Sequence, residues 1–134
     1  MKSLILSVLV LFSFSTFAHE GAHGPEQTMA PHGGVLKDGK NLMAELVQDN
    51  TGVKIYFLTH TGKAITTKSI TLEAKNILLT DAKKKAVSYE LVSQEDSVLL
   101  KFDKSKSYRY NLTMPARYNN VQETLSWHFE PQSN

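Results

Sequence analysis

The sequence predicts an all-β protein, an antiparallel β-sandwich or small barrel of about eight strands. From Gly33 onward, short runs of alternating apolar and polar residues recur about every 8–12 residues, and turn-forming Gly, Asn and Asp separate them. No stretch of that region repeats its apolar residues with the period of an amphipathic helix. The 134 residues divide into a predicted signal peptide (1–18), a flexible tail (19–30) and one β domain (31–134).

Residues 1–18 have the pattern of a secretory signal peptide. Lys2 supplies a short positive region, residues 4–14 are apolar apart from serines, and Thr16 and Ala18 are small residues where a signal peptidase reads the chain. The alternative is an uncleaved anchor, but the apolar run is shorter than the roughly 18–20 residues that span a bilayer. No second run of that length follows, and no Cys is present for lipid attachment. We expect cleavage after Ala18, a periplasmic or secreted location, and no membrane span afterwards.

Residues 19–30 are polar, contain Gly and Pro and lack periodicity, so we expect a flexible tail. Cleavage after Ala18 would make His19 the first residue, and its free α-amine and imidazole Nδ1 could then chelate one metal ion. Both groups are neutral nitrogen donors in part of the molecules near pH 7. Such nitrogen pairs suit Cu(II), to which His23 could add a third nitrogen and Glu20 an oxygen. The alternative is that two histidines in a polar start are there by chance.

The β domain is expected to begin with a turn followed by a hairpin. Residues 31–34 read as a turn, because Pro fixes φ and the two glycines free the backbone after it. Strands are predicted at 41–48 and 53–59, with the turn-forming residues 49–52 between them. Both faces of the second strand are mostly apolar, so we expect it in the middle of a sheet. A histidine therefore stands at each end of this small β unit.

Six further strands are predicted downstream, at 70–73, 77–80, 87–91, 98–102, 108–114 and 125–130. Pro115 is expected to end the strand before it, and Asn119-Asn120 to lie in the loop before the last strand. The strands at 87–91 and 98–102 should pair as a structural hairpin. Because large rings bury about 150–250 Å² each, Trp127 and the aromatic side chains at 57, 102 and 129 should dominate the core.

Several side chains near the first hairpin could bind a transition metal, because imidazole and thioether are both copper ligands and imidazole alone also serves zinc. Met29 and His32 lie three residues apart, and they could share one ion if that approach to the sheet bends back over it. His60 ends the second strand, and the sequence leaves open whether it comes near His32. Met43 is a further candidate, although Met is also a general gap filler in cores.

Two other candidate ligands have plainer explanations. Met114 lies on the apolar side of its alternating strand, so core packing is favoured. His128 alternates away from Trp127, so a solvated position on the outer face is favoured. The metal ligands that the sequence predicts are therefore His19, His23, Met29, His32, His60 and Met43.

Composition and motifs exclude several functional classes. Cysteine is absent, which rules out thiol catalysis, iron–sulfur clusters and cysteine-ligated zinc. The net charge is only +2, whereas a nucleic-acid binder needs a basic face, so we predict no nucleic-acid partner. No nucleophile elbow, phosphate loop or dinucleotide fingerprint is present. An oxidative copper centre on an amino-terminal histidine is the enzyme hypothesis that remains, and a glycine-rich tail preorganises it poorly. We predict a non-enzyme.

Four short motifs follow one another in the first half of the domain: His32-Gly33-Gly34-Val35, Ala44-Glu45-Leu46-Val47, Ile55-Tyr56-Phe57-Leu58 and Gly62-Lys63-Ala64. This series resembles a small periplasmic domain of bacteria, which occurs within the adaptor subunits of heavy-metal efflux pumps and as short free-standing exported proteins. The resemblance implies a compact envelope β domain associated with copper, zinc or similar cations. At Met43 the sequence departs from the pattern, which often has a histidine there. The helical hairpin of a full adaptor has no room in this chain, so the pump-bridging role does not carry over.

The sequence thus predicts a periplasmic protein that binds an exchangeable transition-metal ion, copper with zinc as the alternative. Its role would be sequestration, or handover to an efflux or resistance system through an efflux-pump or other envelope protein. A mobile tail would capture the ion, and weakly held imidazole and thioether groups would release it by ligand exchange. The alternative is an envelope interaction module, in which the histidines are incidental and a sheet edge or aromatic surface binds another protein.

Overall fold

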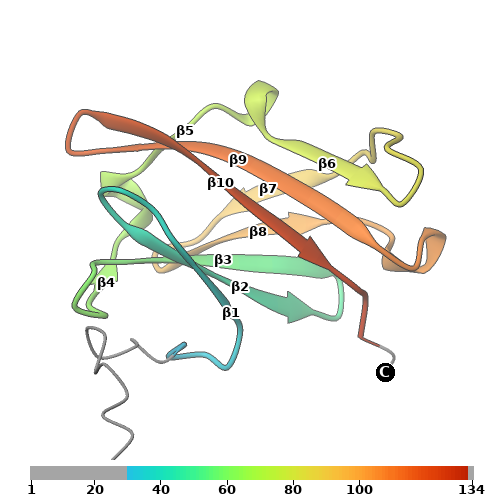
Figure 1. Cartoon of the computed structure of the whole chain (residues 1–134), viewed down its shortest axis with the longest axis horizontal. Helices are drawn as coiled ribbons and strands as arrows, with labels where there is room; N and C mark the ends of the chain where they lie inside the picture. Colours follow the sequence, from blue (N-terminus) through green and yellow to red (C-terminus); the bar gives the residue numbers. More distant parts are fainter. Residues whose placement is uncertain (1–29, 133–134) are drawn as a thin grey trace, which may run out of the picture.

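The structure, a computed structural model that describes residues 30–132, consists of two antiparallel sheets packed face to face (Figure 1). The all-β prediction is confirmed, and the arrangement is a sandwich, not a closed barrel. Residues 30–132 contain ten strands and no α-helix, with short 3₁₀ turns at Thr67–Ser69, Ala74–Asn76 and Lys104–Lys106. The predicted signal peptide and nearly all of the predicted tail, residues 1–29, lie outside the described residues.

The larger sheet has the order β1-β2-β3-β8-β7, with β4 pairing with the end of β3. Its strands are β1 (Val35–Asp38), β2 (Met43–Asp49), β3 (Gly52–Leu58), β4 (Ala64–Ile65), β7 (Glu90–Ser93) and β8 (Ser97–Lys101). β3 lies between β2 and β8, which confirms the central position expected for a strand with two apolar faces. The hairpin of β2 and β3 is confirmed as well, with Asp49 paired to Gly52 at the turn.

The smaller sheet is built around β9 (Tyr110–Tyr118), which pairs with β10 (Val121–Phe129) on one side. On its other side β9 pairs with two short strands, β5 (Thr71–Leu72) and β6 (Leu78–Asp81). The β9–β10 hairpin turns at Asn119 and Asn120, whose φ angles are 49° and 61°. Positive φ at both central residues matches the right-handed twist of the flanking strands, and Asn tolerates it well.

The space between the two sheets is filled by apolar side chains from both. All of the aromatic side chains predicted for the core are buried there: Phe57, Phe102, Trp127 and Phe129. Met114 is fully buried in the same cluster, as core packing predicts. Each such side chain contributes about 1.5–3 kcal/mol by leaving water, so the fold needs no disulfide.

The strand predictions differ from the structure in several places, including the start of the last strand, which begins at Val121 and not at residue 125. β1 and the two-residue β4 were not predicted, because neither is long enough to show a clear alternation. Pro115 does not end a strand but lies inside β9, opposite Thr124. β9 pairs with β6 up to Thr113 and with β5 from Ala116 onward, so Pro115 lies between the two short strands. Its missing N–H therefore removes no hydrogen bond to either strand. The strand predicted from residue 87 begins at Glu90, because Val87 still donates to Leu79 beside β6.

Hydrogen bonds between the sheets hold the β1–β2 hairpin against the β9–β10 hairpin. The Trp127 indole N–H donates to the carbonyl of Val35 at 3.2 Å. The backbone N–H of Asn41 donates to Glu123 Oε2 at 2.9 Å, and the Asn41 side chain donates to the carbonyl of Tyr118. These contacts fix the hairpin whose outer face carries the candidate site.

Candidate metal-binding site around His32

The site is built on the face of β2 that points away from the core. Ala44 and Leu46 belong to the core cluster, so Glu45 between them points to the opposite, outer face of the larger sheet. Tyr56 on β3 is the register partner of Glu45 and therefore lies beside it on that face. Glu45 is nevertheless completely buried, with 0% of its surface exposed. Something other than the core must cover it.

The cover is the strap, which we define as residues 30–34. It enters β1 through a turn in which the Gly33 N–H donates to the carbonyl of Ala30 and Gly33 has a φ of 73°. Gly34 passes so close to β2 that a Cβ there would lie 2.3 Å from the carbonyl oxygen of Leu46. Only glycine fits both positions without strain or a clash. In Figure 1 the strap is the blue start of the coloured chain, on the side of β2 away from β9 and β10.

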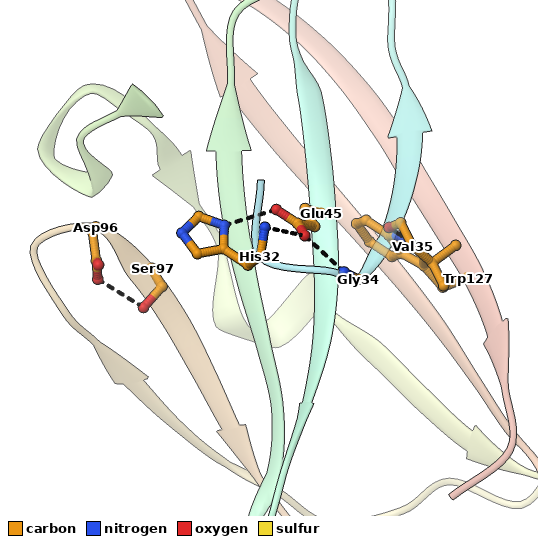
Figure 2. Close-up of polar contacts among 7 residues, drawn as sticks. All are labelled: His32, Gly34, Val35, Glu45, Asp96, Ser97 and Trp127. Carbon is orange, nitrogen blue, oxygen red and sulfur yellow. Dashed lines mark hydrogen bonds and ion pairs between the residues drawn. The ribbon is translucent and has the colours of Figure 1, made fainter. Parts of the chain in front are cut away.

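The strap supplies every hydrogen bond that reaches the Glu45 carboxylate from residues 30–132. Oε1 accepts from the backbone N–H of His32 at 2.9 Å and from that of Gly34 at 2.8 Å. Oε2 lies 2.8 Å from the imidazole Nδ1 of His32 (Figure 2). A buried carboxylate is tolerated only when such partners compensate for lost hydration. The turn at the glycines and the carboxylate on β2 therefore depend on each other.

The imidazole of His32 is held in position on two sides. Its ring stacks on that of Tyr56, with the centroids 3.7 Å apart and the planes 10° from parallel. Its Nδ1 faces Glu45, whereas Figure 2 shows Nε2 on the side of the ring that is turned away from this carboxylate. The side chain is 40% exposed. Within residues 30–132, Nδ1 is the one ring nitrogen with a hydrogen-bond partner, so Nε2 can receive a ligand.

His60 lies next to a different carboxylate. Its Nδ1 is 3.1 Å from Oδ1 of Asp38, and its Nε2 is 3.3 Å from the carbonyl oxygen of Lys40. Both side chains of this pair are exposed. Met43, predicted as a ligand, is the register partner of Asp38 but is only 6% exposed and does not belong to the core cluster. It fills the outer face between β1 and β3 and offers little surface to an ion.

The structure does not gather the predicted ligands into one complete site. Within residues 30–132 no group of three or more His, Asp or Glu side chains is close enough together to hold a metal ion. His32 and His60 contact separate carboxylates on separate strands. The predicted ligands His19, His23 and Met29 precede the described residues. Of the six, His32 has the geometry of an anchored ligand.

The sequence analysis did not predict a functional role for two residues of this site. Glu45 and Tyr56 are part of the quoted motifs, yet neither was given a role. The available signal was the charge of Glu45 on a strand whose other outward residues, Met43 and Val47, are apolar. A carboxylate in such a row needs a partner, and a histidine 13 residues upstream is a natural one.

Comparisons with known proteins leave the family open. The chain matches no model of a protein family, no curated protein and no solved structure. The resemblance to the efflux-adaptor domain therefore stays a prediction from four short motifs. Across residues 30–132, no helix has the length and apolar character needed to cross a membrane.

Proposed function

We propose that the protein binds a transition-metal ion in the cell envelope, copper with zinc as the alternative, and that His32 is the ligand contributed by the folded domain. The observation that carries this proposal is the anchored imidazole, held at Nδ1 by Glu45 and turned outward at Nε2. Metal-bound histidines usually have a carboxylate or carbonyl on the second ring nitrogen. The stack on Tyr56 reduces the ordering that metal binding would otherwise require.

The remaining ligands would come from the chain before residue 30. One imidazole does not hold an ion by itself, and Met29 precedes His32 by only three residues. His23 and, after signal cleavage, His19 with its α-amine would add nitrogen donors. Nitrogen and thioether donors together fit copper, whereas the imidazoles alone fit zinc. Several donors from this segment beside one anchored imidazole would let the ion leave by ligand exchange.

The role that follows is sequestration of the ion, or its handover to an efflux or resistance system, without catalysis. Export rests on the signal-peptide pattern of residues 1–18, and the link to efflux rests on the resemblance of the four motifs. The receiving partner would be an efflux-pump or other envelope protein. The ion would move by ligand exchange, leaving the tail donors for a site that binds it more strongly.

One observation favours the rival function, an envelope interaction module with incidental histidines. Residues 30–132 contain no three-ligand cluster. In that case the His32–Glu45 contact would serve only to fasten the strap.

A titration separates the two functions. The chain beginning at His19 and a chain beginning at Ala30 are each titrated with Cu(II), Cu(I) and Zn(II) in competition with a chelator. We expect the longer chain to bind Cu(II) at least about tenfold more tightly, the equivalent of about 1.4 kcal/mol. The shortened chain retains every residue of the core and of the strap. Micromolar or weaker binding that is the same in both chains would favour the interaction module.

A further inference from the structure

Glu45 is the one charged side chain among residues 30–132 that is buried. It lies on the outer face of β2, where a carboxylate would ordinarily reach water, and it is shielded there by the strap. Burying a charge is costly, so a carboxylate in this position must be held by a full set of donors. The two backbone N–H groups both reach Oε1, so the imidazole Nδ1 is the group that faces Oε2.

We propose that Glu45 is a positioning residue that sets the tautomer of His32, keeping the ring proton on Nδ1 so that Nε2 presents its lone pair to a metal ion. The consequence for metal affinity rests on the proposed function. The tautomer itself is a property of the metal-free protein.

The hydrogen-bond inventory of the carboxylate leads to this assignment. Oε1 already accepts from two backbone donors, the N–H groups of His32 and Gly34. A carboxylate ion has no proton to donate, so in the 2.8 Å contact of Oε2 with Nδ1 we assign the proton to Nδ1. In a neutral imidazole the other nitrogen is then the acceptor. Nε2 is therefore the basic atom of the ring, and it is the atom turned away from Glu45 (Figure 2).

The stack on Tyr56 fixes the plane of the His32 ring, and the hydrogen bond to Glu45 selects one of the two orientations in that plane. With centroids 3.7 Å apart and planes 10° from parallel, the imidazole lies flat on the phenol ring. A half-turn of the ring in this plane would place a carbon atom against Oε2 and lose the hydrogen bond. Carboxylates that hold metal-bound histidines in this way raise the basicity of the ligand, and their loss typically costs about 10–100-fold in metal affinity.

The substitution Glu45→Gln tests the assignment because its geometry forces the opposite tautomer. Gln has one acceptor oxygen and one NH₂ donor. Its oxygen can replace Oε1 and accept from both backbone N–H groups, so the strap stays seated. The NH₂ group then faces Nδ1 and donates to it, and the ring proton must move to Nε2. The reverse placement of the amide would leave two backbone donors facing a third donor.

The readout is the protonation pattern of the His32 ring nitrogens in the exported chain without metal, by long-range ¹H–¹⁵N NMR at about pH 8.5, where free imidazole is neutral. We expect the proton on Nδ1 in the wild type and on Nε2 in Glu45→Gln. Competition titration should then show the variant binding Cu(II) and Zn(II) about 10–100-fold more weakly. The control is Glu73→Gln, since Glu73 also accepts a hydrogen bond, from the Asn76 side chain, but is exposed and precedes the 3₁₀ turn at Ala74–Asn76. It should leave both readouts unchanged.

The outcomes distinguish the inference from the proposed function. A wild-type proton on Nε2, or the same tautomer in wild type and Glu45→Gln, would overturn the assignment. If the variant does not fold, the wild-type spectrum alone decides, because the proposal requires Nδ1–H there. A switched tautomer with unchanged metal affinity would refute the positioning role. Nδ1–H in a wild type that binds no metal would instead overturn the proposed function and leave the tautomer assignment in place.

Discussion

At the scale of single residues, two adjacent glycines place His32 over the sheet. A Cβ at Gly34 would lie 2.3 Å from the Leu46 carbonyl oxygen and 2.8 Å from a methyl group of Val47. We therefore expect Gly34→Ala to push the strap away from β2 and to lower the free energy of unfolding by about 1–3 kcal/mol, as overpacking does. Urea denaturation measures the stability, and the ring-current shift that Tyr56 imposes on the His32 protons measures the stacking.

The matched control at the neighbouring position is Gly33→Ala. A Cβ there meets nothing within 4 Å, but the φ of 73° is unfavourable for alanine. We expect a cost of about 1–2 kcal/mol from the backbone alone, with the stacking of His32 on Tyr56 retained. If the His32 proton shifts in Gly34→Ala equal those of the wild type, the close approach of the strap has no influence on the imidazole.

At the scale of elements, the β2–β3 turn is held by one carboxylate. Oδ1 of Asp49 accepts from the backbone N–H and from the hydroxyl of Thr51, each at 2.9 Å. The backbone hydrogen bond from Thr51, then that from its side chain, lowers the pKa of Asp49 below its ordinary value of 3.8. Burial opposes this, and the charges of Lys54 and Lys104 add smaller effects in the lowering direction. Since the folded pKa lies below the unfolded one, the carboxylate stabilises the fold fully above about pH 4 and loses this contribution as the pH falls through the folded value.

Asp49→Ala should therefore be less stable than the wild type at pH 7, and the difference should shrink at about pH 2.5 as wild-type Asp49 becomes protonated. Chemical denaturation of both proteins at the two pH values measures this. The effect is modest because the carboxylate is partly exposed to solvent. An equal difference at both pH values would mean that the turn depends on the side-chain shape and not on its charge.

The strands show how far the sequence predicts this fold. Alternation located most strands because a half-buried strand must alternate, and it placed Trp127 and Met114 in the core correctly. It failed at Pro115, since what makes proline acceptable inside β9 is the passage from β5 to β6, a tertiary feature. In the candidate site, too, the local sequence pattern predicts one part and tertiary contacts decide the rest. His32 was predicted from its residue type and turn, whereas its contacts with Glu45 and Tyr56 exist only because the strap folds back across β2.

At the scale of the whole molecule, the sandwich supports the strap and its partly exposed imidazole. Trp127 and Glu123 on β10 form hydrogen bonds with the β1–β2 hairpin, which holds the sheet under the strap in place. The candidate ligands His19, His23 and Met29 precede the strap in the sequence.

The central claim, that His32 is the metal ligand of the domain, is tested most directly by Cu(II) competition titration of the exported chain with His32→Ala and His128→Ala. His128 is the matched control, because its Nδ1 also contacts a side-chain oxygen, that of Asn111, but it is exposed on the outer face of the other sheet. We predict that His32→Ala weakens Cu(II) binding at least about tenfold, or about 1.4 kcal/mol, and that His128→Ala does not change it. Equal affinities for the wild type and His32→Ala would contradict the account.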